Sequence, residues 1–135
     1  MSHSHSAAAH IRTRDDHAQE TAEDYVEAVA ELIEQKDECR IVDLAERFGV
    51  SHVTAIRVVK RLVGEGLMAT EPRRPIRLTD TGQRLAKKCQ ARHEVVYQFL
   101  RKLGVGKAVA IIDAEGIEHH LSPETLSRMR AYLKS

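Results

Sequence analysis

Residues 41–64 read IVDLAERFGVSHVTAIRVVKRLVG, and this stretch decides the fold. Apolar side chains recur three and four residues apart on both sides of Gly49-Val50-Ser51, which predicts two short helices joined by a tight turn. Gly49 is typical of a helix C-terminus, and Ser51 is typical of a helix N-cap. Helices over 41–48 and about 51–64 with this turn between them indicate a helix-turn-helix.

The second of these helices is expected to have an apolar inner side and a basic outer side. Its inward residues are expected to be Ile56, Val59 and Val63. Residues 67–70 and 76–78 then flank Glu71-Pro72-Arg73-Arg74-Pro75, a basic tip bounded by prolines, so we expect a two-stranded wing. Cations on a helix-turn-helix followed by a wing favour binding to the phosphates of double-stranded DNA. The expected DNA-contacting residues are Ser51, His52, Thr54, Arg57, Lys60, Arg61, Arg73 and Arg74.

Helices are also expected on both sides of the winged helix. Before it, Thr21 begins a helix with an apolar stripe of Tyr25, Val29, Leu32 and Ile33. After it comes a long helix from Thr79 or Asp80 to about Leu103, whose apolar stripe runs from Leu85 to Leu103 and includes His93. A helix from Lys107 to about His120, with Val109 and Ile112 inward, and a last helix from Ser122 to Leu133 complete the chain. The fold class is therefore mainly α with a small β wing.

Composition excludes several classes of protein. The 135 residues include no Trp and only 4% aromatic residues, which argues against a stacking platform for single-stranded nucleic acid. Residues 1–50 carry 5 basic and 12 acidic side chains, whereas 51–78 carry 6 basic and 2 acidic ones, so a cation site and a phosphate-binding surface can share one chain. No membrane-spanning run or signal peptide is visible, and Cys39 and Cys89 match no paired motif, so we expect a cytoplasmic protein with buried thiols.

Ligand-type side chains recur at helical spacing in three segments. They are Asp24 and Glu27, then His93, then Glu115, Glu118 and His119. Steps of three and four residues share a helix face, so the last three can converge on one point. They continue the expected inward stripe of Ile112, where carboxylates need a compensating charge such as a divalent cation. Taken singly, the acidic pair also fits an ordinary solvated helix face, and His93 also fits a core histidine.

The same segments carry a resemblance to a known family. Asp24-Tyr25-x-Glu27, Arg92-His93-Glu94 with Gln98-Phe99-Leu100, and Asp113-x-Glu115-Gly116-Ile117-Glu118-His119-His120 with Leu121-Ser122 resemble the manganese transport regulators of the diphtheria-toxin-repressor family. The likeness covers about residues 22–133. It implies that Asp24, Glu27, His93, Glu115, Glu118 and His119 form a two-metal site, with Glu115 and Glu118 shared between the ions and His120 not a ligand.

The resemblance also implies which metal is sensed. The iron-responsive branch of the family has Met and Cys at the positions of Asp24 and Glu115. Carboxylate and imidazole ligands suit Mn²⁺, whereas sulfur ligands favour softer metals, so Mn²⁺ is expected and Fe²⁺ is the alternative. The residues leave open whether one or two ions bind per subunit.

These observations predict a metal-dependent repressor, not an enzyme, that binds palindromic operator DNA as a homodimer and has no membrane partner. Residues 1–20 are expected to be a flexible tail, 21–79 the winged-helix DNA-binding domain, and 80–135 a helical dimerisation and metal-binding domain. Two alternatives stay open at this point. One is a metal-independent winged-helix regulator that responds to a small molecule, and the other is a metallohydrolase that uses Glu115, Glu118 and His119.

Overall fold

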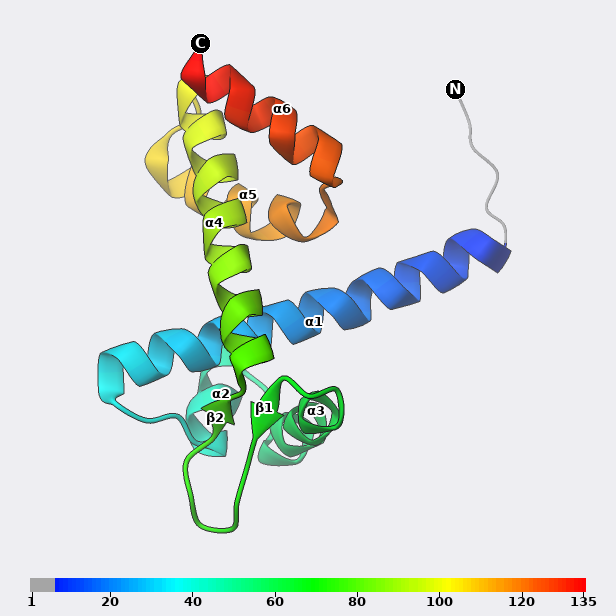
Figure 1. The fold of residues 1–135 in the computed structure, drawn as a ribbon, viewed down its shortest axis with the longest axis vertical. Helices are drawn as coiled ribbons and strands as arrows, with labels where there is room; N and C mark the ends of the chain where they lie inside the picture. Colours follow the sequence, from blue (N-terminus) through cyan, green and yellow to red (C-terminus); the bar gives the residue numbers. More distant parts are fainter. Residues whose placement is uncertain (1–6) are drawn as a thin grey trace. The chain divides into compact units, whose positions relative to one another are not determined.

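Helix α1 spans Ala7–Lys36 in the computed structural model, which describes residues 7–135 and their side chains from His17 onward (Figure 1). The prediction of a tail over 1–20 is therefore wrong for residues 7–20, and residues 1–6 lie outside the described residues. The helix continues towards the N-terminus because residues 7–36 contain several alanines and neither glycine nor proline. Poor amphipathicity hid this part of the helix from the pattern of apolar residues.

The remaining elements follow the expected order. They are α2 Ile41–Phe48, α3 His52–Gly64, β1 Met68–Ala69, β2 Arg77–Leu78, α4 Asp80–Lys102, α5 Lys107–Ile117, the 3₁₀ turn η1 Glu118–His120 and α6 Pro123–Lys134. Strands β1 and β2 pair antiparallel, with Met68 opposite Leu78 and Ala69 opposite Arg77. The predicted fold class, mainly α with a small wing, is confirmed.

The described residues divide into two compact units. We call Ala22–Ala91 the winged-helix unit, and the residues up to Thr21 together with Arg92–Ser135 the helical unit. Helices α1 and α4 each contribute residues to both units. The boundary between two domains at residues 79 and 80 stays a prediction.

The core of the winged-helix unit joins α1, α2, α3 and the wing. Its buried members include Val26 and Val29 of α1, Leu44 of α2, Leu62 of α3, and Met68 and Ile76 of the wing. The Tyr25 ring stacks on Phe48, with ring centroids 4.3 Å apart. On α3 the inward residues are Ala55, Val59 and Leu62, whereas Ile56 is 41% exposed, so its predicted inward position is wrong. The buried residues Ala55 and Leu62 thus each precede by one position the residues that were expected to face inward, Ile56 and Val63.

Two turns determine how α2 and α3 meet. Gly49 ends α2 with a φ of 63°, a left-handed conformation that favours glycine. The hydroxyl of Ser51 then caps α3 by accepting a hydrogen bond from the Thr54 backbone N–H at 3.1 Å. Both features were predicted from the sequence. They fix the start of α3, the helix that carries most of the expected base-contacting residues.

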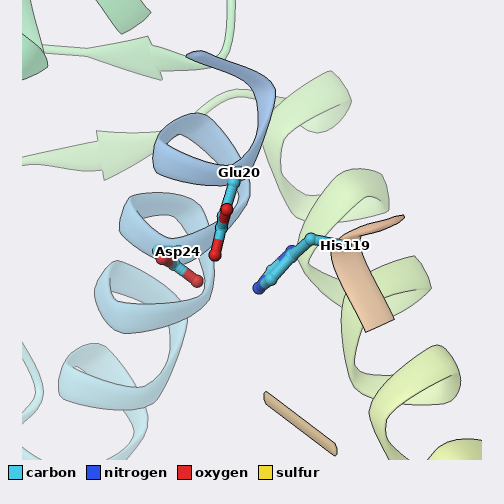
Figure 2. A group of neighbouring side chains, drawn as sticks. All are labelled: Glu20, Asp24 and His119. Atoms are coloured by element: carbon cyan, nitrogen blue, oxygen red, sulfur yellow. The ribbon is translucent and has the colours of Figure 1, made fainter. Parts of the chain in front are cut away.

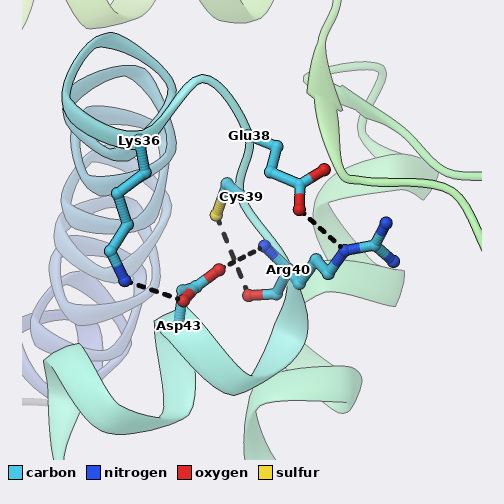
Figure 3. Close-up of polar contacts among 5 residues, drawn as sticks. All are labelled: Lys36, Glu38, Cys39, Arg40 and Asp43. Atoms are coloured by element: carbon cyan, nitrogen blue, oxygen red, sulfur yellow. Dashed lines mark hydrogen bonds and ion pairs between the residues drawn. The ribbon is translucent and has the colours of Figure 1, made fainter.

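The connection from α1 to α2 is held by polar contacts around Asp43 (Figure 3). The Asp43 carboxylate accepts a hydrogen bond from the Arg40 backbone N–H at 2.9 Å and pairs with Lys36 at 3.3 Å. The Arg40 backbone N–H, followed by the cation of Lys36, lowers the pKa of Asp43. Burial raises the pKa of the neighbouring Cys39 thiol to about 12. Both cysteines are buried free thiols, as predicted.

In the helical unit, α5 and α6 pack on the C-terminal part of α4. Val96, Ala114 and Leu126 form the buried centre of this core. On α5 the inward residues are Ala110 and Ala114, while Val109 is 53% and Ile112 is 69% exposed. The predicted inner face of α5 is therefore wrong. Leu103, the last residue of the apolar stripe of α4, is 57% exposed. An apolar helix without clear periodicity gives no signal for its buried face, and here the small alanines allow close packing.

Candidate metal centre and nucleic-acid interface

The helical unit contains a buried carboxylate between two imidazoles. The Glu118 side chain is 1% exposed. Its Oε2 lies 3.4 Å from His93 Nδ1, and its Oε1 lies 3.5 Å from His119 Nε2. His119 is 2% exposed and His93 is 27% exposed, so the group is covered by protein with an opening on the His93 side. The structure thus brings together three of the six predicted metal ligands.

The fold explains why a charged side chain is buried here. Helix α5 buries Ala110 and Ala114, and Glu118 is the next position on that inner face at four-residue spacing. Arg92, which is 8% exposed, lies close enough to Glu118 to feel its charge. Burial lowers the pKa of the Arg92 guanidinium, and the negative charge of Glu118 raises it. A buried carboxylate is costly unless positive charge compensates it. One carboxylate with two imidazoles is also a donor set that fits a divalent transition metal.

The block from Glu115 to His120 is not one continuous helix. The α-helix ends at Ile117 and Glu118–His120 follow as a 3₁₀ turn, so the predicted helix reaches His120 but its last turn is 3₁₀. Glu115 lies on α5 and is exposed. Among the described residues, neither Glu115 nor His93 belongs to a group of three ligand-type side chains whose donor atoms all lie within 4.8 Å of one another. The participation of Glu115 in metal binding stays a prediction.

Helix α1 presents a row of carboxylates. Asp24 and Glu27, both half-buried, are joined by Glu20 one turn earlier, so the three follow at steps of four and three residues on one helix face. Figure 2 shows Glu20 and Asp24 side by side on α1, and also labels His119 of η1. Asp24 and Glu27 remain predicted ligands. Glu20 is not among the predicted ligands because it falls in the expected tail, although its four-residue spacing to Asp24 is a signal in the sequence.

A second buried carboxylate lies inside the winged-helix unit. Glu23 is 1% exposed, and its Oε2 accepts a hydrogen bond from the Cys89 thiol at 3.1 Å. Both residues were outside the predicted site. The signal for Glu23 was its place on the inner stripe of α1, three residues before Val26. This pair joins α1 to α4 within the unit.

The predicted DNA-contacting residues lie on α3 and the wing of the winged-helix unit. All except the half-buried Thr54 are exposed: Ser51, His52, Arg57, Lys60, Arg61, Arg73 and Arg74. Ser51 and Thr54 also bond to each other, with 3.0 Å between their hydroxyl oxygens, as part of the cap of α3. Arg61 pairs with Glu65 at 3.7 Å, a weak exposed contact that leaves the guanidinium accessible.

A hollow of about 440 Å³ lies between α2, α3 and the wing. Its charged lining residues are Arg40, Lys60, Arg73 and Arg74 against one acidic residue, Glu71, and His52 also lines it. Arg40 was missed in the sequence, where it precedes α2 and so looked like part of a connecting loop. Its exposed side chain lines the same hollow as the wing arginines, which gives the surface a positive centre suited to a phosphate.

Comparison with known proteins matches both parts of the chain. Residues 17–76 match the family model of the iron-dependent repressor N-terminal DNA-binding domain. Residues 79–135 match the model of the iron-dependent repressor metal-binding and dimerisation domain. No described helix has the length and apolar character needed to cross a membrane.

Named relatives point the same way. The chain is 43% identical over 121 residues to the transcriptional regulator MntR of Escherichia coli O6:H1, covering 90% of this chain and 78% of that protein. It is 37% identical over 107 residues to the HTH-type transcriptional regulator MntR of Bacillus subtilis (strain 168), covering 79% of this chain and 75% of that protein.

Solved structures include a manganese-dependent transcriptional repressor in complex with manganese. It is 32% identical, with a TM-score of 0.73 over 84% of this chain and 52% of that one, so this chain spans about half its length. The two family models together match nearly the whole chain, as the sequence resemblance predicted. The chain therefore belongs to the diphtheria-toxin-repressor family of iron-dependent and related metal-dependent repressors, whose members are transcriptional regulators and not enzymes.

Proposed function

We propose that this chain is a manganese-dependent repressor that binds palindromic operator DNA as a homodimer when its metal site is loaded. The observation that carries the proposal is the buried Glu118 carboxylate between His93 and His119. It occurs in a chain that also has an exposed basic helix-turn-helix and wing. The names of the MntR relatives and of the manganese-bound solved repressor support manganese as the metal.

In this proposal His93, Glu118 and His119 hold the ion, and the other ligands are Asp24, Glu27 and Glu115, as the family resemblance implies. The bound ion supplies the positive charge that compensates these carboxylates. All six residues offer oxygen or nitrogen and none offers sulfur, which favours Mn²⁺ over softer metals. Fe²⁺ is the alternative, and we propose one or two ions per subunit.

The winged-helix unit supplies the DNA-binding surface. His52, Thr54 and Arg57 near the start of α3 are placed to reach base edges in the major groove. Arg73 and Arg74 of the wing, with Arg40 beside them, neutralise phosphates. Such a regulator works where the DNA is, so we also propose a cytoplasmic location.

The exposed apolar face of α5 supports a homodimer. Val109, Ile111, Ile112 and Ile117 are between 37% and 69% exposed on this one helix, and Val109 and Ile112 share a face at three-residue spacing. Exposed apolar side chains gathered on one element mark interaction surfaces. In a two-fold dimer the same face of a second copy would cover them, and two winged helices would then reach two half-sites of an operator.

The proposed mechanism is linkage between metal binding and DNA binding. Helices α1 and α4 run through both units, and both helices carry predicted ligands, Asp24 and Glu27 on α1 and His93 on α4. Side chains that hold one ion together restrict the helices that carry them. If the restricted form is the one that fits the operator, metal raises operator affinity, and the operator raises metal affinity by the same factor.

The proposal is tested by operator binding at buffered free Mn²⁺, Fe²⁺ and Zn²⁺, using a duplex that the manganese-loaded protein selects from a random library. Glu118→Gln should abolish the response to metal, and Glu124→Gln, an exposed carboxylate on α6, should leave it unchanged. Normal metal dependence in Glu118→Gln would overturn the proposal. Metal choice is tested by Asp24→Met with Glu115→Cys, which should lose Mn²⁺ activation and gain Fe²⁺ activation.

A further inference from the structure

We propose that Glu20 is a metal ligand of this chain in addition to the six family positions, and that it binds the ion held by His119. The inference rests on the proposed function, because it requires Glu118 and His119 to hold a divalent cation. Glu20 and His119 both belong to the helical unit, although almost 100 residues separate them in the sequence. The part of α1 that precedes the six predicted ligands would thus contribute to the site.

The distance between the two side chains carries the argument. A carboxylate oxygen of Glu20 and an imidazole nitrogen of His119 lie within 4.8 Å of one another. In Figure 2 the His119 ring points towards Glu20. Oxygen and nitrogen ligands of first-row divalent metals lie about 2.0–2.2 Å from the ion, so two of them on one ion are about 3 to 4.4 Å apart. A small side-chain rotation is enough to bring both onto one ion.

The backbone of Glu20 is well supported for this role. It lies in the interior of α1, thirteen residues after the helix begins at Ala7 and one turn before Asp24. The hydroxyl of the next residue, Thr21, donates a hydrogen bond to the His17 carbonyl at 3.0 Å within the same helix. Glu20 therefore does not lie at a helix end, and its carboxylate is presented from a helix and not from a loop.

His120 orients the Glu20 carboxylate. Its Nε2 lies 3.2 Å from Glu20 Oε2. A carboxylate has two oxygens, so one can accept a hydrogen bond from His120 while the other binds the ion. Carboxylate ligands of metals are commonly held by such hydrogen bonds. His120 is then a positioning residue, which gives a role to the one residue of the Glu118–His120 turn that the family ligand pattern leaves out.

Exposure and charge agree with this assignment. Glu118 is 1% exposed, whereas the Glu20 side chain is 31% exposed, so Glu118 forms the buried side of the site and Glu20 its solvent-facing side. Each carboxylate ligand offsets part of the charge of a bound divalent cation, and Glu20 adds such a charge on the solvent-facing side of the site.

The test is a Mn²⁺ titration of the full chain, with free Mn²⁺ followed by electron paramagnetic resonance. The variants are Glu20→Gln, Glu20→Asp and, as a matched control on α1, Glu34→Gln, whose carboxylate is exposed. We expect Glu20→Gln to weaken binding of one ion about 10-fold or more, Glu20→Asp to give a smaller loss, and Glu34→Gln to match the unmodified chain. Circular dichroism checks that α1 is intact in each variant.

Two more variants, His120→Ala and Glu118→Gln, separate metal ligation by Glu20 from a merely structural contact. His120→Ala should weaken Mn²⁺ binding less than Glu20→Gln does, since it removes only the orienting hydrogen bond. Equal Mn²⁺ affinity in Glu20→Gln and the unmodified chain, with Glu118→Gln impaired, would overturn the Glu20 assignment and leave the proposed function standing. An unmodified chain that binds no Mn²⁺ would overturn both.

Discussion

Truncating Ile112 to alanine should weaken the homodimer strongly. Ile112 on α5 is 69% exposed in the single chain. Complete burial of an isoleucine side chain is worth about 1.5–3 kcal/mol, so covering this exposed part is worth about 1–2 kcal/mol. A two-fold interface contains the residue twice, which doubles the effect to about 2–4 kcal/mol per dimer. At 1.4 kcal/mol per factor of ten, the dimer dissociation constant should rise about 30- to 1,000-fold.

Sedimentation equilibrium over a wide range of protein concentration measures this constant directly. The matched control is Val42→Ala, which truncates an apolar side chain of α2 that is 51% exposed and lies outside α5. We expect the control to dimerise like the unmodified chain, and metal-free circular dichroism to be the same for all three proteins. If the dimer dissociation constant of Ile112→Ala stays within about threefold of the unmodified value, Ile112 of α5 does not lie in the dimer interface.

Three further predictions concern the winged-helix unit. Arg73→Ala with Arg74→Ala should weaken binding to all duplexes and reduce the salt slope of log K by about 1.8, because each phosphate contact contributes about 0.9; an unchanged slope would remove the wing tip from the interface. Asp43→Ala removes the hydrogen bond from the Arg40 backbone N–H and should cost about 1 kcal/mol of unfolding free energy at pH 7, measured in urea. The pKa of Asp43 is lowered in the folded chain, so its contribution to the free energy of unfolding is present above the unfolded pKa, about 3.9, and is lost as the pH falls through the folded pKa. If Asp43→Ala still costs the same free energy below this range, the Asp43 carboxylate is not the source of the stabilisation. Cys39, with a pKa of about 12, should have about a thousandfold less thiolate at pH 8 than an ordinary thiol. Its labelling by iodoacetamide, followed peptide by peptide, should therefore be slow until urea unfolds the chain. Fast labelling in the native state would show that the thiol is accessible.

Local signals predicted most of the fold. Gly49 and Ser51 mark the turn of the helix-turn-helix by their backbone preferences, and the structure places a left-handed residue and an N-cap at these positions. Proline-bounded basic residues marked the wing, and Ser122-Pro123 marked the start of α6. Each of these signals is a property of a few neighbouring residues, which is why the sequence alone was sufficient.

Errors arose where neighbouring residues carry no such signal. Most of α5 is apolar, so only packing against α4 and α6 decided that Ala110 and Ala114 face inward while Ile112 is exposed. The N-terminal half of α1 is helical without an amphipathic pattern, and for that reason Glu20 was placed in a tail.

Residue spacing alone could predict only part of the candidate metal centre, and the reason is physical. His93, Glu118 and His119 come from two segments, and no spacing within either segment could show that they meet. The resemblance to a family supplied that information, and the structure brings these three together. The contact between Glu20 and His120 joins residues a hundred positions apart and had no counterpart in the resemblance.

The central claim is that metal binding and operator binding are linked, and the most direct measurement is the Mn²⁺ affinity of the chain with and without DNA. Free Mn²⁺ would be followed by electron paramagnetic resonance with the selected operator duplex, with an unrelated duplex of equal length, and with no DNA. We predict that the operator raises Mn²⁺ affinity about 5- to 150-fold over the unrelated duplex, the same factor by which Mn²⁺ raises operator affinity. Equal Mn²⁺ affinity in all three conditions would contradict the account.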